Sequence, residues 1–449
     1  MGIQGIHPVL REMAAIFHEQ GKQVFLVGGA VRDLLRGKAA QDWDLATDAL
    51  PGEVCALFPR VVPTGIKHGT VTVLFKGRAL EVTTFRTESD YRDGRRPGQV
   101  SFAATIEEDL SRRDLTMNAI ALELPSGRRV DPFDGAGDIR NRIIRCVGKP
   151  GERFAEDGLR PLRALRFAAQ LDFRIEEATL AAIPGAIPTT AKVSAERIRD
   201  EIDKIIASPL PSRALRPMEA TGLLELLLPE LTRCRGVEQK GFHRFDVLDH
   251  ALLACDYSAR TGAPPEVRLA ALFHDTGKPA CRRLGEGGVW TFYRHEEESA
   301  RLSAAILRRY RYPNAVRETV CRLIAQHMFH YTGDWTDAAV RRFIIRSGEE
   351  HLDDLYRLRL ADIYGTAGLE PPPDCLLPLT RRVEAVLARS RALSLRDLAV
   401  SGRDLMARGI PAGKRLGLIL GELLEAVLED PALNEREKLL EIAGRLNKR

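Results

Sequence analysis

The chain has 449 residues, too many for one hydrophobic core, so two or more domains are expected. Hydrophobic residues make up 44% and charged residues 29%, as is usual for a soluble globular protein. The formal net charge of +5 is too small to identify a partner, although it permits a local basic surface for a polyanion. No stretch reaches the roughly 18 apolar residues that a membrane span requires, which excludes a membrane-spanning protein.

The cysteines and the start of the chain indicate a cytoplasmic protein. The seven cysteines include no C-x-x-C pair and are odd in number, which fits reduced thiols and no structural zinc. Residues 1–22 predict an amphipathic helix, without the apolar region and the cleavage site of a signal peptide.

Short apolar runs between turns predict an α/β segment in the first third of the chain. From about Glu152 apolar residues recur with the period of a helix, and everything beyond is expected to be helical. Residues 88–100, rich in Asp, Arg and Gly, predict a mobile loop. We expect a helix at residues 30–36 and strands at residues 24–27, 43–46, 70–75 and 80–85.

A Gly-Gly turn follows the first predicted strand. Gly28 and Gly29 let the backbone approach a ligand closely, and the helix start behind them attracts phosphate. Many such turns are purely structural. Arg32, in the first helical turn, can contact a phosphate or simply pair with Asp33.

Two aspartates, Asp42 and Asp44, lie two residues apart in a predicted strand, where alternation places both carboxylates on one face. Like charges repel unless a cation bridges them, and Mg²⁺ prefers carboxylates together with substrate phosphates. An isolated D-x-D is usually a solvated strand end, but the preceding Gly-Gly unit favours a site that activates a hydroxyl and stabilises pyrophosphate. Glu81 is either a third carboxylate of this site or an exposed edge residue.

The segment RRDLTMN brings together Arg112, Arg113, Asp114 and Asn118. Arginine binds a triphosphate through paired hydrogen bonds, and a carboxylate accepts hydrogen bonds from ribose hydroxyls. The alternative is a charged helix end.

The segment EDGLR is predicted to open a long helix. Asp157 and Arg160 share a face, either as an ordinary ion pair or as acceptors and donors that read a base edge without a template. Arg163 and Arg166 follow Arg160 at three-residue spacing and form a row of arginines with it. This row either follows a phosphate backbone or forms a solvated surface.

Six motifs in order resemble the class II tRNA nucleotidyltransferases and bacterial poly(A) polymerases: VGGAVRD, DWDLATDA, EVTTFRTE, RRDLTMNAIA, DPFDGAGDIRNRIIRCVG and RFAEDGLRPLRALRFAAQLDF. The resemblance is strong over residues 24–172, and SAERIRDEIDKII is similar to the next helical motif, in the family's neck. It implies an α+β fold with a mixed-sheet nucleotidyltransferase head, an all-α neck and a helical tail that binds tRNA. The expected divisions are 1–145, 146–235 and 369–449, with a further domain at 236–368.

The resemblance also implies a reaction. The 3′-hydroxyl of tRNA would attack the α-phosphate of CTP or ATP and release pyrophosphate, with Mg²⁺ held by Asp42 and Asp44. Asp157 and Arg160 would pair with the base, supported by Glu156. Residues 88–100 resemble a flexible loop linked to adding the terminal A. The nucleotide-contacting residues implied are Gly28, Gly29, Arg32, Arg113, Asp114, Asn118, Glu156, Asp157, Arg160 and Arg163.

A second divalent metal site is expected in the helical half. An adjacent His-Asp pair is followed by Gly-Lys, and such ligands suit a transition metal or Mg²⁺, whose bound water can attack a phosphoester. The pattern resembles an HD phosphohydrolase domain, although a lone helical histidine is usually structural. The matching ligands are His250, His274, Asp275 and Asp362, with His295 and His327 between the last two.

One departure from the HD pattern leaves its activity open. Ser299 stands where glycine is common, so the domain is either a hydrolase of 2′,3′-cyclic phosphates or 2′-phosphates or a structural element. In the tail, Gly409, Gly413 and Gly417 either let a helix start approach RNA phosphates or permit close helix packing.

The leading hypothesis is CCA addition to tRNA, with the tRNA 3′ end and acceptor stem, CTP and ATP as partners. The alternatives are a poly(A) polymerase, an enzyme that adds only CC or only A, and an HD phosphohydrolase with an RNA-binding head.

Overall fold

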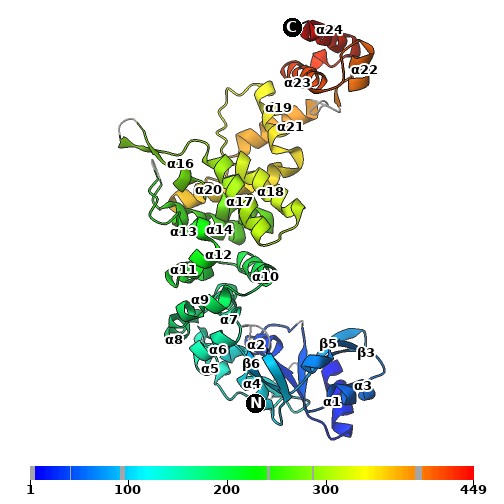
Figure 1. Ribbon diagram of the computed structural model, residues 1–449, viewed down its shortest axis with the longest axis vertical. Helices are drawn as coiled ribbons and strands as arrows, with labels where there is room; N and C mark the ends of the chain where they lie inside the picture. Colours follow the sequence, from blue (N-terminus) through cyan, green and yellow to red (C-terminus); the bar gives the residue numbers. More distant parts are fainter. Residues whose placement is uncertain are drawn as a thin grey trace. The chain divides into compact units, whose positions relative to one another are not determined.

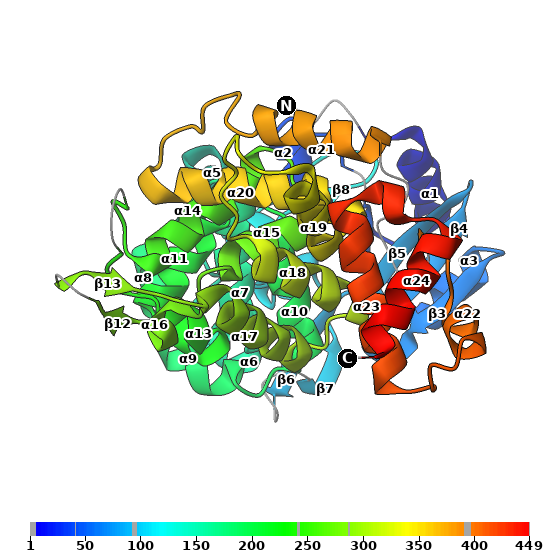
Figure 2. The same ribbon diagram turned by 90° about the horizontal axis from the view of Figure 1, so that it is seen from above.

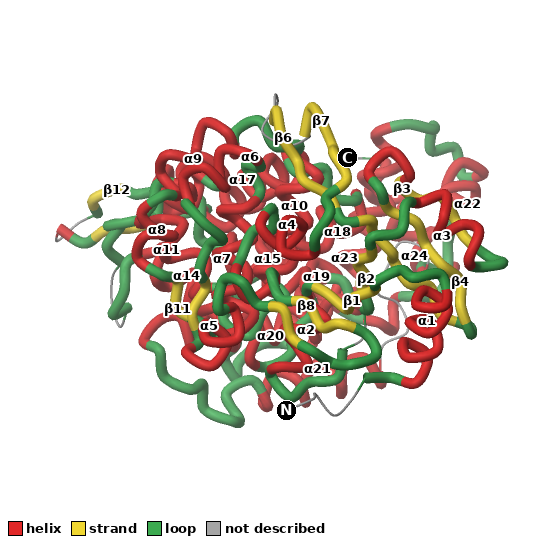
Figure 3. The backbone as a smooth tube through the Cα atoms, turned by 90° about the horizontal axis from the view of Figure 1, so that it is seen from below, coloured by secondary structure: helices red, strands yellow, loops and turns green. Residues whose placement is uncertain are grey.

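The computed structural model describes residues 6–40, 42–91, 97–239, 243–285, 288–389 and 397–448. The chain divides into two compact units: Met1–Thr232 with Arg309–Arg311, and Arg233–Arg308 with Tyr312–Arg449. The first unit contains the large sheet, and helices make up most of the rest of the chain (Figures 1 and 3). The predicted α+β class is therefore confirmed.

A mixed seven-stranded sheet forms the N-terminal part of the first unit, in the order β3-β4-β5-β2-β1-β8-β9. Strands β2 and β5 pair parallel, and the other neighbours pair antiparallel. The strands are β1 (Val24–Val27), β2 (Asp44–Thr47), β3 (Val61–Gly65), β4 (Thr70–Phe75), β5 (Arg78–Thr84), β8 (Ala121–Glu123) and β9 (Arg129–Val130).

Strand β1 is buried on both faces, which explains its unbroken apolar sequence VFLV. Phe25 packs in one hydrophobic cluster with Leu110, and Leu26 packs in a second, larger cluster with Phe17. The sheet is thus fixed in place by burial from two sides. The helices of this part are α1 (Pro8–Glu19), α2 (Gly29–Leu35), α3 (Pro51–Leu57), α4 (Ile106–Ser111) and α5 (Gly135–Asn141).

The rest of the first unit is mainly helical. Beyond Asn141, its only paired strands among the described residues are β10 (Ile143–Ile144) and β11 (Arg174–Ile175), which are parallel. The helices are α6 (Pro150–Glu156), α7 (Arg160–Leu171), α8 (Glu177–Ala181), α9 (Ile183–Thr190), α10 (Ala195–Ile206), α11 (Ser212–Ala220), α12 (Leu223–Leu227) and α13 (Pro229–Thr232).

The second unit is built on packed helices. Helix α14 contacts α15 and α20, and α15 also contacts α18 and α20 (Figures 1 and 2). Helices α22 to α24 share a separate apolar cluster that includes Leu405, Leu423 and Leu439. The elements are α14 (Val247–Arg260), α15 (Pro265–Phe273), α16 (Lys278–Cys281), β12 (Arg283–Leu284), β13 (Trp290–Thr291), α17 (His295–Arg309), α18 (Asn314–Gln326), α19 (Asp337–Ser347), α20 (Leu352–Ala367), α21 (Leu377–Arg389), α22 (Gly402–Ala407), α23 (Lys414–Glu429) and α24 (Arg436–Asn447).

Several sequence expectations need correction. The strand predicted at residues 43–46 begins at Asp44, so Asp42 lies in the bend before it and not in the strand. The predicted strand at 80–85 spans Arg78–Thr84, and the helix predicted at 30–36 starts at Gly29. Strand β11, which pairs with β10, and the short pair β12–β13 interrupt the segment expected to be wholly helical.

The loop expected at residues 88–100 is largely a hairpin. Strands β6 (Arg86–Tyr91) and β7 (Pro97–Phe102) pair antiparallel through most of it, and residues 92–96 lie outside the described residues. Among the residues described, no helix is both long and apolar enough to cross a bilayer.

Candidate functional site

Three carboxylates gather where β2 begins. Asp44 lies opposite Glu81 of parallel β5 in the strand register. Partial desolvation raises the pKa of Asp44, and the negative charges of Glu81 and Asp42 act in the same direction, against the positive charge of Arg113. A divalent cation would relieve this repulsion, so the three side chains form a candidate cation site. Glu81 is exposed, but it lies beside Asp44 and not on an edge strand of the sheet.

Gly28 lets the side chains of Arg113 and Asp44 lie close to the backbone of the turn. Its φ of 70° lies in the left-handed region that favours glycine. A Cβ there would lie 3.1 Å from Arg113 Nη1 and 3.7 Å from Asp44 Oδ2. A Cβ at Gly29 would lie 3.5 Å from Arg32 Nη2. The turn thus brings two predicted arginines and an aspartate together around its backbone.

Arg32 is engaged inside the protein. Its Nε and Nη2 donate to the two carboxylate oxygens of Asp33, both at 3.0 Å, so the two side chains are paired in this structure. Its Nη1 donates to Asn118 Oδ1 at 3.1 Å, and Asn118 Nδ2 donates to Asp114 Oδ1 at 3.3 Å. This chain of hydrogen bonds links the first predicted motif to the second.

Asp109 is a site residue that the sequence analysis missed. It is buried in α4 and accepts from Arg112 Nη2 at 2.8 Å and from Arg113 Nη2 at 3.3 Å. Burial opposes its ionisation, but the two guanidinium groups outweigh that effect and lower its pKa. The signal was the helical spacing of an acid followed three and four residues later by arginines.

Asp114 is buried and paired with a residue of the next motif. Its Oδ2 accepts from Arg163 Nε at 2.6 Å. Burial opposes ionisation, but Arg163 and Asn118 stabilise the carboxylate and lower its pKa to about 2. Because Arg163 pairs with Asp114, it is not part of a row of unpaired arginines along α7.

Asp157 and Arg160 bind different partners, so the predicted pair is not formed here. Asp157 Oδ2 accepts from Arg197 Nη2 at 2.8 Å. Arg160 donates to Glu156 Oε2 at 2.5 Å and to the Arg112 carbonyl at 3.0 Å. The latter contact places EDGLR beside RRDLTMN.

The long helix predicted to open with EDGLR begins only at the last residue of that segment, and the preceding residues separate it from another helix. Helix α6 ends at Glu156 and α7 begins at Arg160. Between them, a Cβ at Gly158 would lie 2.5 Å from the Thr189 carbonyl oxygen, so only glycine permits this close approach. Both predictions for Arg166 are wrong as well, because it is buried and its Nε donates to Glu201 Oε2 at 2.6 Å.

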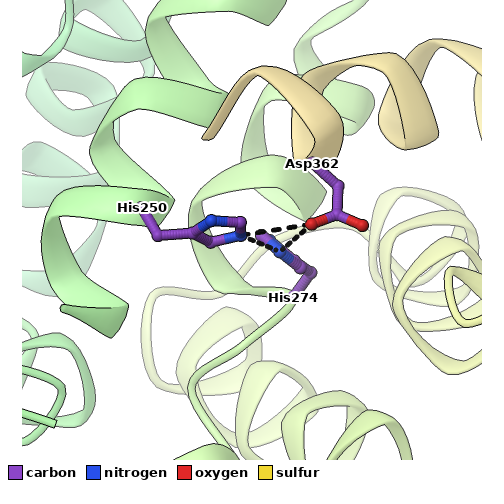
Figure 4. A group of neighbouring side chains, drawn as sticks. All are labelled: His250, His274 and Asp362. Carbon is purple, nitrogen blue, oxygen red and sulfur yellow. Dashed lines mark hydrogen bonds and ion pairs between the residues drawn. The ribbon is translucent and has the colours of Figure 1, made fainter. Parts of the chain in front are cut away.

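A second cluster of ionisable side chains lies inside the second unit. His250 comes from α14, His274 directly follows α15, and Asp362 comes from α20, and Figure 4 shows the three side chains pointing toward one another. The two Nε2 atoms are 3.0 Å apart, and Asp362 Oδ1 lies 3.2 Å from His250 Nε2 and 3.6 Å from His274 Nε2. The structure thus brings these predicted metal ligands together.

Asp275 lies at the centre of this cluster, with two histidines beyond the predicted ligand set. Its Oδ2 is 3.3 Å from His250 Nε2 and 3.4 Å from His274 Nε2. Its Oδ1 is 3.2 Å from His295 Nε2 and 3.9 Å from His327 Nε2. Both histidines were visible in the sequence, but nothing in their spacing placed them here.

The ring orientations favour metal binding. The Nδ1 atoms of His274, His295 and His327 lie 2.9, 2.8 and 2.7 Å from backbone carbonyl oxygens. In a neutral ring, a proton on Nδ1 leaves a lone pair on Nε2, the atom that faces Asp275 or Asp362. Burial lowers the pKa of His327 to about 3, which keeps this ring neutral.

Two close approaches hold the cluster together. A Cβ at Gly365 would lie 2.7 Å from the His250 carbonyl oxygen, so this glycine lets α20 approach α14. Ser299, the departure from the HD pattern, is buried, and its Oγ accepts from Gly277 N at 2.8 Å. The serine therefore ties α17 to the turn after Asp275 and does not disrupt the cluster.

The cluster opens into a cavity of about 900 Å³. Its lining includes the cations Lys278, Arg294 and Arg359 and the aromatic residues Phe292 and Tyr293. The same lining holds the carboxylates Asp275, Glu296, Asp362 and Glu370, so its own charges do not favour an anion.

The tail glycines do not pack closely. For Gly409, Gly413 and Gly417, no other described atom lies within 4 Å of the Cβ that a substitution would add. The close-packing alternative is therefore wrong.

Three family models match the chain. They are the "Poly A polymerase head domain" at residues 24–145, the "Probable RNA and SrmB- binding site of polymerase A" at 172–234, and "tRNA nucleotidyltransferase domain 2 putative" at 289–443. The third model covers part of the region expected to be an HD domain.

The similar proteins extend over nearly the whole chain. A CCA-adding enzyme of Lactobacillus johnsonii is 36% identical over 97% of this chain and 95% of its own length. One of Geobacillus stearothermophilus is 36% identical over 94% of this chain and 92% of its own length. The solved structure of the Bacillus stearothermophilus CCA-adding enzyme in complex with CTP is 32% identical and covers 99% of this chain and 98% of its own, with a TM-score of 0.74. The chain belongs to the CCA-adding enzyme family of tRNA nucleotidyltransferases.

Proposed function

We propose that this protein adds CCA to the 3′ end of tRNA, using CTP and ATP. The observation that carries the proposal is that the carboxylates at β2 and the segments RRDLTMN and EDGLR lie together. Contacts of four residues join them, namely Gly28, Asn118, Arg163 and Arg160. A relative that is 32% identical was solved in complex with CTP, one of the two nucleotides of this reaction.

The acidic end of the site would serve the chemical step. Asp42 and Asp44, with Glu81 adjacent, would hold Mg²⁺, which activates the attacking hydroxyl and stabilises the leaving pyrophosphate. Arg113 lies against Asp44 and would face the phosphates of the incoming nucleotide. Asp114 is ionised at neutral pH, so it would accept hydrogen bonds from the ribose.

The neck would select the base. Asp157 and Arg160 would present an acceptor and donors to the Watson–Crick edge, with Glu156 orienting Arg160 and Arg197 orienting Asp157. Because both residues bind other protein groups here, base binding would exchange those partners. A change of partner between additions would let one pocket accept first C and then A.

The domain boundaries remain part of this proposal. The catalytic head would span residues 1–145, the neck 146–235, the metal-binding helical domain 236–368 and the tRNA-binding tail 369–449.

The test uses tRNA transcripts that end before CCA. The full-length protein is incubated with Mg²⁺ and with CTP, ATP or both, and the 3′ ends are sequenced. We expect CC with CTP alone and CCA with both nucleotides. Addition of A alone, arrest at CC with both nucleotides, or a long run of A would contradict the proposal and identify one of the alternative enzymes.

A second activity is favoured by the buried cluster, namely hydrolysis of 2′,3′-cyclic phosphates or 2′-phosphates. Four predicted ligands converge there, beside a cavity with three cationic residues. The test is hydrolysis of 2′,3′-cyclic AMP and 2′-AMP by the full chain with Mn²⁺ or Ni²⁺. Activity that is lost in His274→Ala supports this function, and equal activity in that variant would contradict it.

A further inference from the structure

Asp109 is a buried carboxylate next to the nucleotide site, and the proposed reaction does not use it. It lies in α4, four residues before Arg113. We propose that Asp109 is a positioning residue of nucleotide addition, which orients the Arg113 guanidinium toward the triphosphate of the incoming CTP or ATP. The inference rests on the proposed addition of CCA and deepens it, since Asp109 itself would touch neither nucleotide.

Three donors fix the Oδ1 atom of Asp109. Arg112 donates to it from Nε at 3.0 Å and from Nη2 at 2.8 Å, and the backbone N of Arg86 donates to it at 3.4 Å. The residue is only 1% exposed. Because these contacts come from two separate segments of the chain, they keep the carboxylate in one orientation and leave Oδ2 for a further donor.

Arg113 supplies the donor to Oδ2, from Nη2 at 3.3 Å. Among the described residues, Arg113 forms no other ion pair, and its Nε is buried without a hydrogen-bond partner. Its Nη1 donates to the Asn118 carbonyl oxygen over a long distance of 3.4 Å. The position of this guanidinium therefore depends mainly on the carboxylate of Asp109.

The two ends of the Arg113 guanidinium face different carboxylates. Nη2 binds Asp109, whereas Nη1 lies on the side of the Gly28 turn that also contacts Asp44 Oδ2. Asp44 attracts the guanidinium toward the carboxylates that would hold Mg²⁺. The charge of Asp109 opposes this attraction, so that Arg113 stays available to the phosphates and does not take the place of the metal ion.

Helix α4, which carries Asp109, is fixed at its start and along its buried face. Thr105 and Glu108 form a capping box, in which each side chain accepts from the backbone N–H of the other residue. Ile106 and Leu110 pack in one hydrophobic cluster with Phe85. The carboxylate therefore projects from an anchored helix, as a positioning role requires.

Asp109 should act equally on CTP and ATP. Arg113 would contact phosphates, which the two nucleotides share. The base-selecting Arg160 lies one step further away, because Asp109 reaches it through Arg112, whose carbonyl oxygen accepts from Arg160 Nη2 at 3.0 Å. The proposal therefore predicts weaker binding of any triphosphate, and not a change in the preferred base.

The experiment measures binding of CTP and of ATP to the full-length protein, by isothermal titration calorimetry with Mg²⁺ and without tRNA. Asp109→Asn keeps the shape of the side chain but replaces an acceptor by an NH₂ group that faces Arg113. We expect the dissociation constants of both nucleotides to rise at least about 10-fold, because a hydrogen bond between charged groups is lost. An unchanged dissociation constant for either nucleotide would overturn the proposal.

A double-mutant cycle shows whether Asp109 acts through Arg113. In protein that already carries Arg113→Gln, the further change Asp109→Asn should alter the two dissociation constants less than about 3-fold. An equal loss of binding in both backgrounds would mean that Asp109 supports only the fold, and it would refute the positioning role.

Two further variants keep the test decisive. Arg112→Gln removes two of the contacts that fix the Asp109 carboxylate, so it should weaken both nucleotides about 3-fold. If Asp109→Asn does not fold, unchanged binding in Arg112→Gln refutes the proposal. Glu107→Gln is the matched control, since it neutralises an exposed acid of α4 and should bind both nucleotides normally.

Nucleotide addition to tRNA separates this proposal from the function on which it rests. In that assay, Asp109→Asn should raise the KM for CTP about 10-fold with a smaller change in kcat, and a fall in kcat at unchanged KM would contradict the positioning role. Binding that depends on Asp109, in a protein that adds no nucleotide, would support the positioning role and contradict CCA addition. Addition of CCA with normal nucleotide binding in Asp109→Asn would overturn only the positioning role.

Discussion

The acidic site at β2 and the histidine–aspartate cluster of the second unit hold their charges in different ways. Asp42, Asp44 and Glu81 are exposed, whereas His274 and Asp275 are at most 1% exposed. An exposed carboxylate set binds a cation weakly until substrate phosphates complete the coordination. If the buried histidines and carboxylates bind a cation, they should hold it without substrate, because leaving those groups unpaired costs stability.

The largest effect is expected at the acidic site. Asp42→Ala should lower the rate of nucleotide addition on the order of 1,000-fold or more, because the leaving group loses its electrostatic partner. Binding of tRNA, measured by filter retention, should remain, since phosphate contacts elsewhere supply its affinity. Glu107→Ala, at an exposed acid of α4, is the control. Near-normal turnover in Asp42→Ala would remove the metal assignment.

Metal removal sharpens the comparison. At about 1,000 times the dissociation constant, a metal that binds only the folded state adds about 4 kcal/mol of stability. Treatment with EDTA should therefore lower the melting temperature of the second unit, and Mn²⁺ should restore it. His274→Gln should lose most of that gain. An equal gain in this variant would show that the buried cluster does not bind the ion.

The buried pair Arg166–Glu201 tests how far the first unit depends on fully paired charges. Glu201→Gln should destabilise the protein by about 3 kcal/mol, because Arg166 would stay buried without its counter-charge. Urea unfolding followed by circular dichroism measures the loss. The double substitution Arg166→Met with Glu201→Leu should recover most of it. A single substitution without effect would mean that water reaches the guanidinium.

The smallest effect concerns base selection. Asp157→Ala should reduce the preference for the correct nucleotide about 10-fold, or about 1.4 kcal/mol, while addition continues. Competition between CTP, ATP and UTP, with sequencing of the products, measures it. Unchanged selection would refute base reading by this residue, and a loss of all addition would place Asp157 in the chemical step instead.

The sequence predicted features that depend on neighbouring residues. Strands β1 and β4 have the predicted bounds, and the Gly-Gly turn lies against Asp44. The adjacent pair His274-Asp275 lies in the buried cluster that it indicated, because two neighbouring residues can be recognised together without long-range information.

Features that depend on distant residues could not be predicted. Asp157 is bound by Arg197 of α10, so the local spacing that suggested a pair with Arg160 was misleading. The burial of Arg166 depends on Glu201, and the break at Gly158 depends on the Thr189 carbonyl. His295 and His327 reach Asp275 only through the packing of α17 and α18 against the other helices.

The most direct test of two separate chemical sites measures both reactions in two variants. Asp44→Asn and Asp275→Asn are each assayed for nucleotide addition to tRNA lacking CCA and for hydrolysis of 2′,3′-cyclic AMP. We predict that Asp44→Asn loses only addition and that Asp275→Asn loses only hydrolysis. Addition that survives in Asp44→Asn, or a loss of both reactions in both folded variants, would contradict this division.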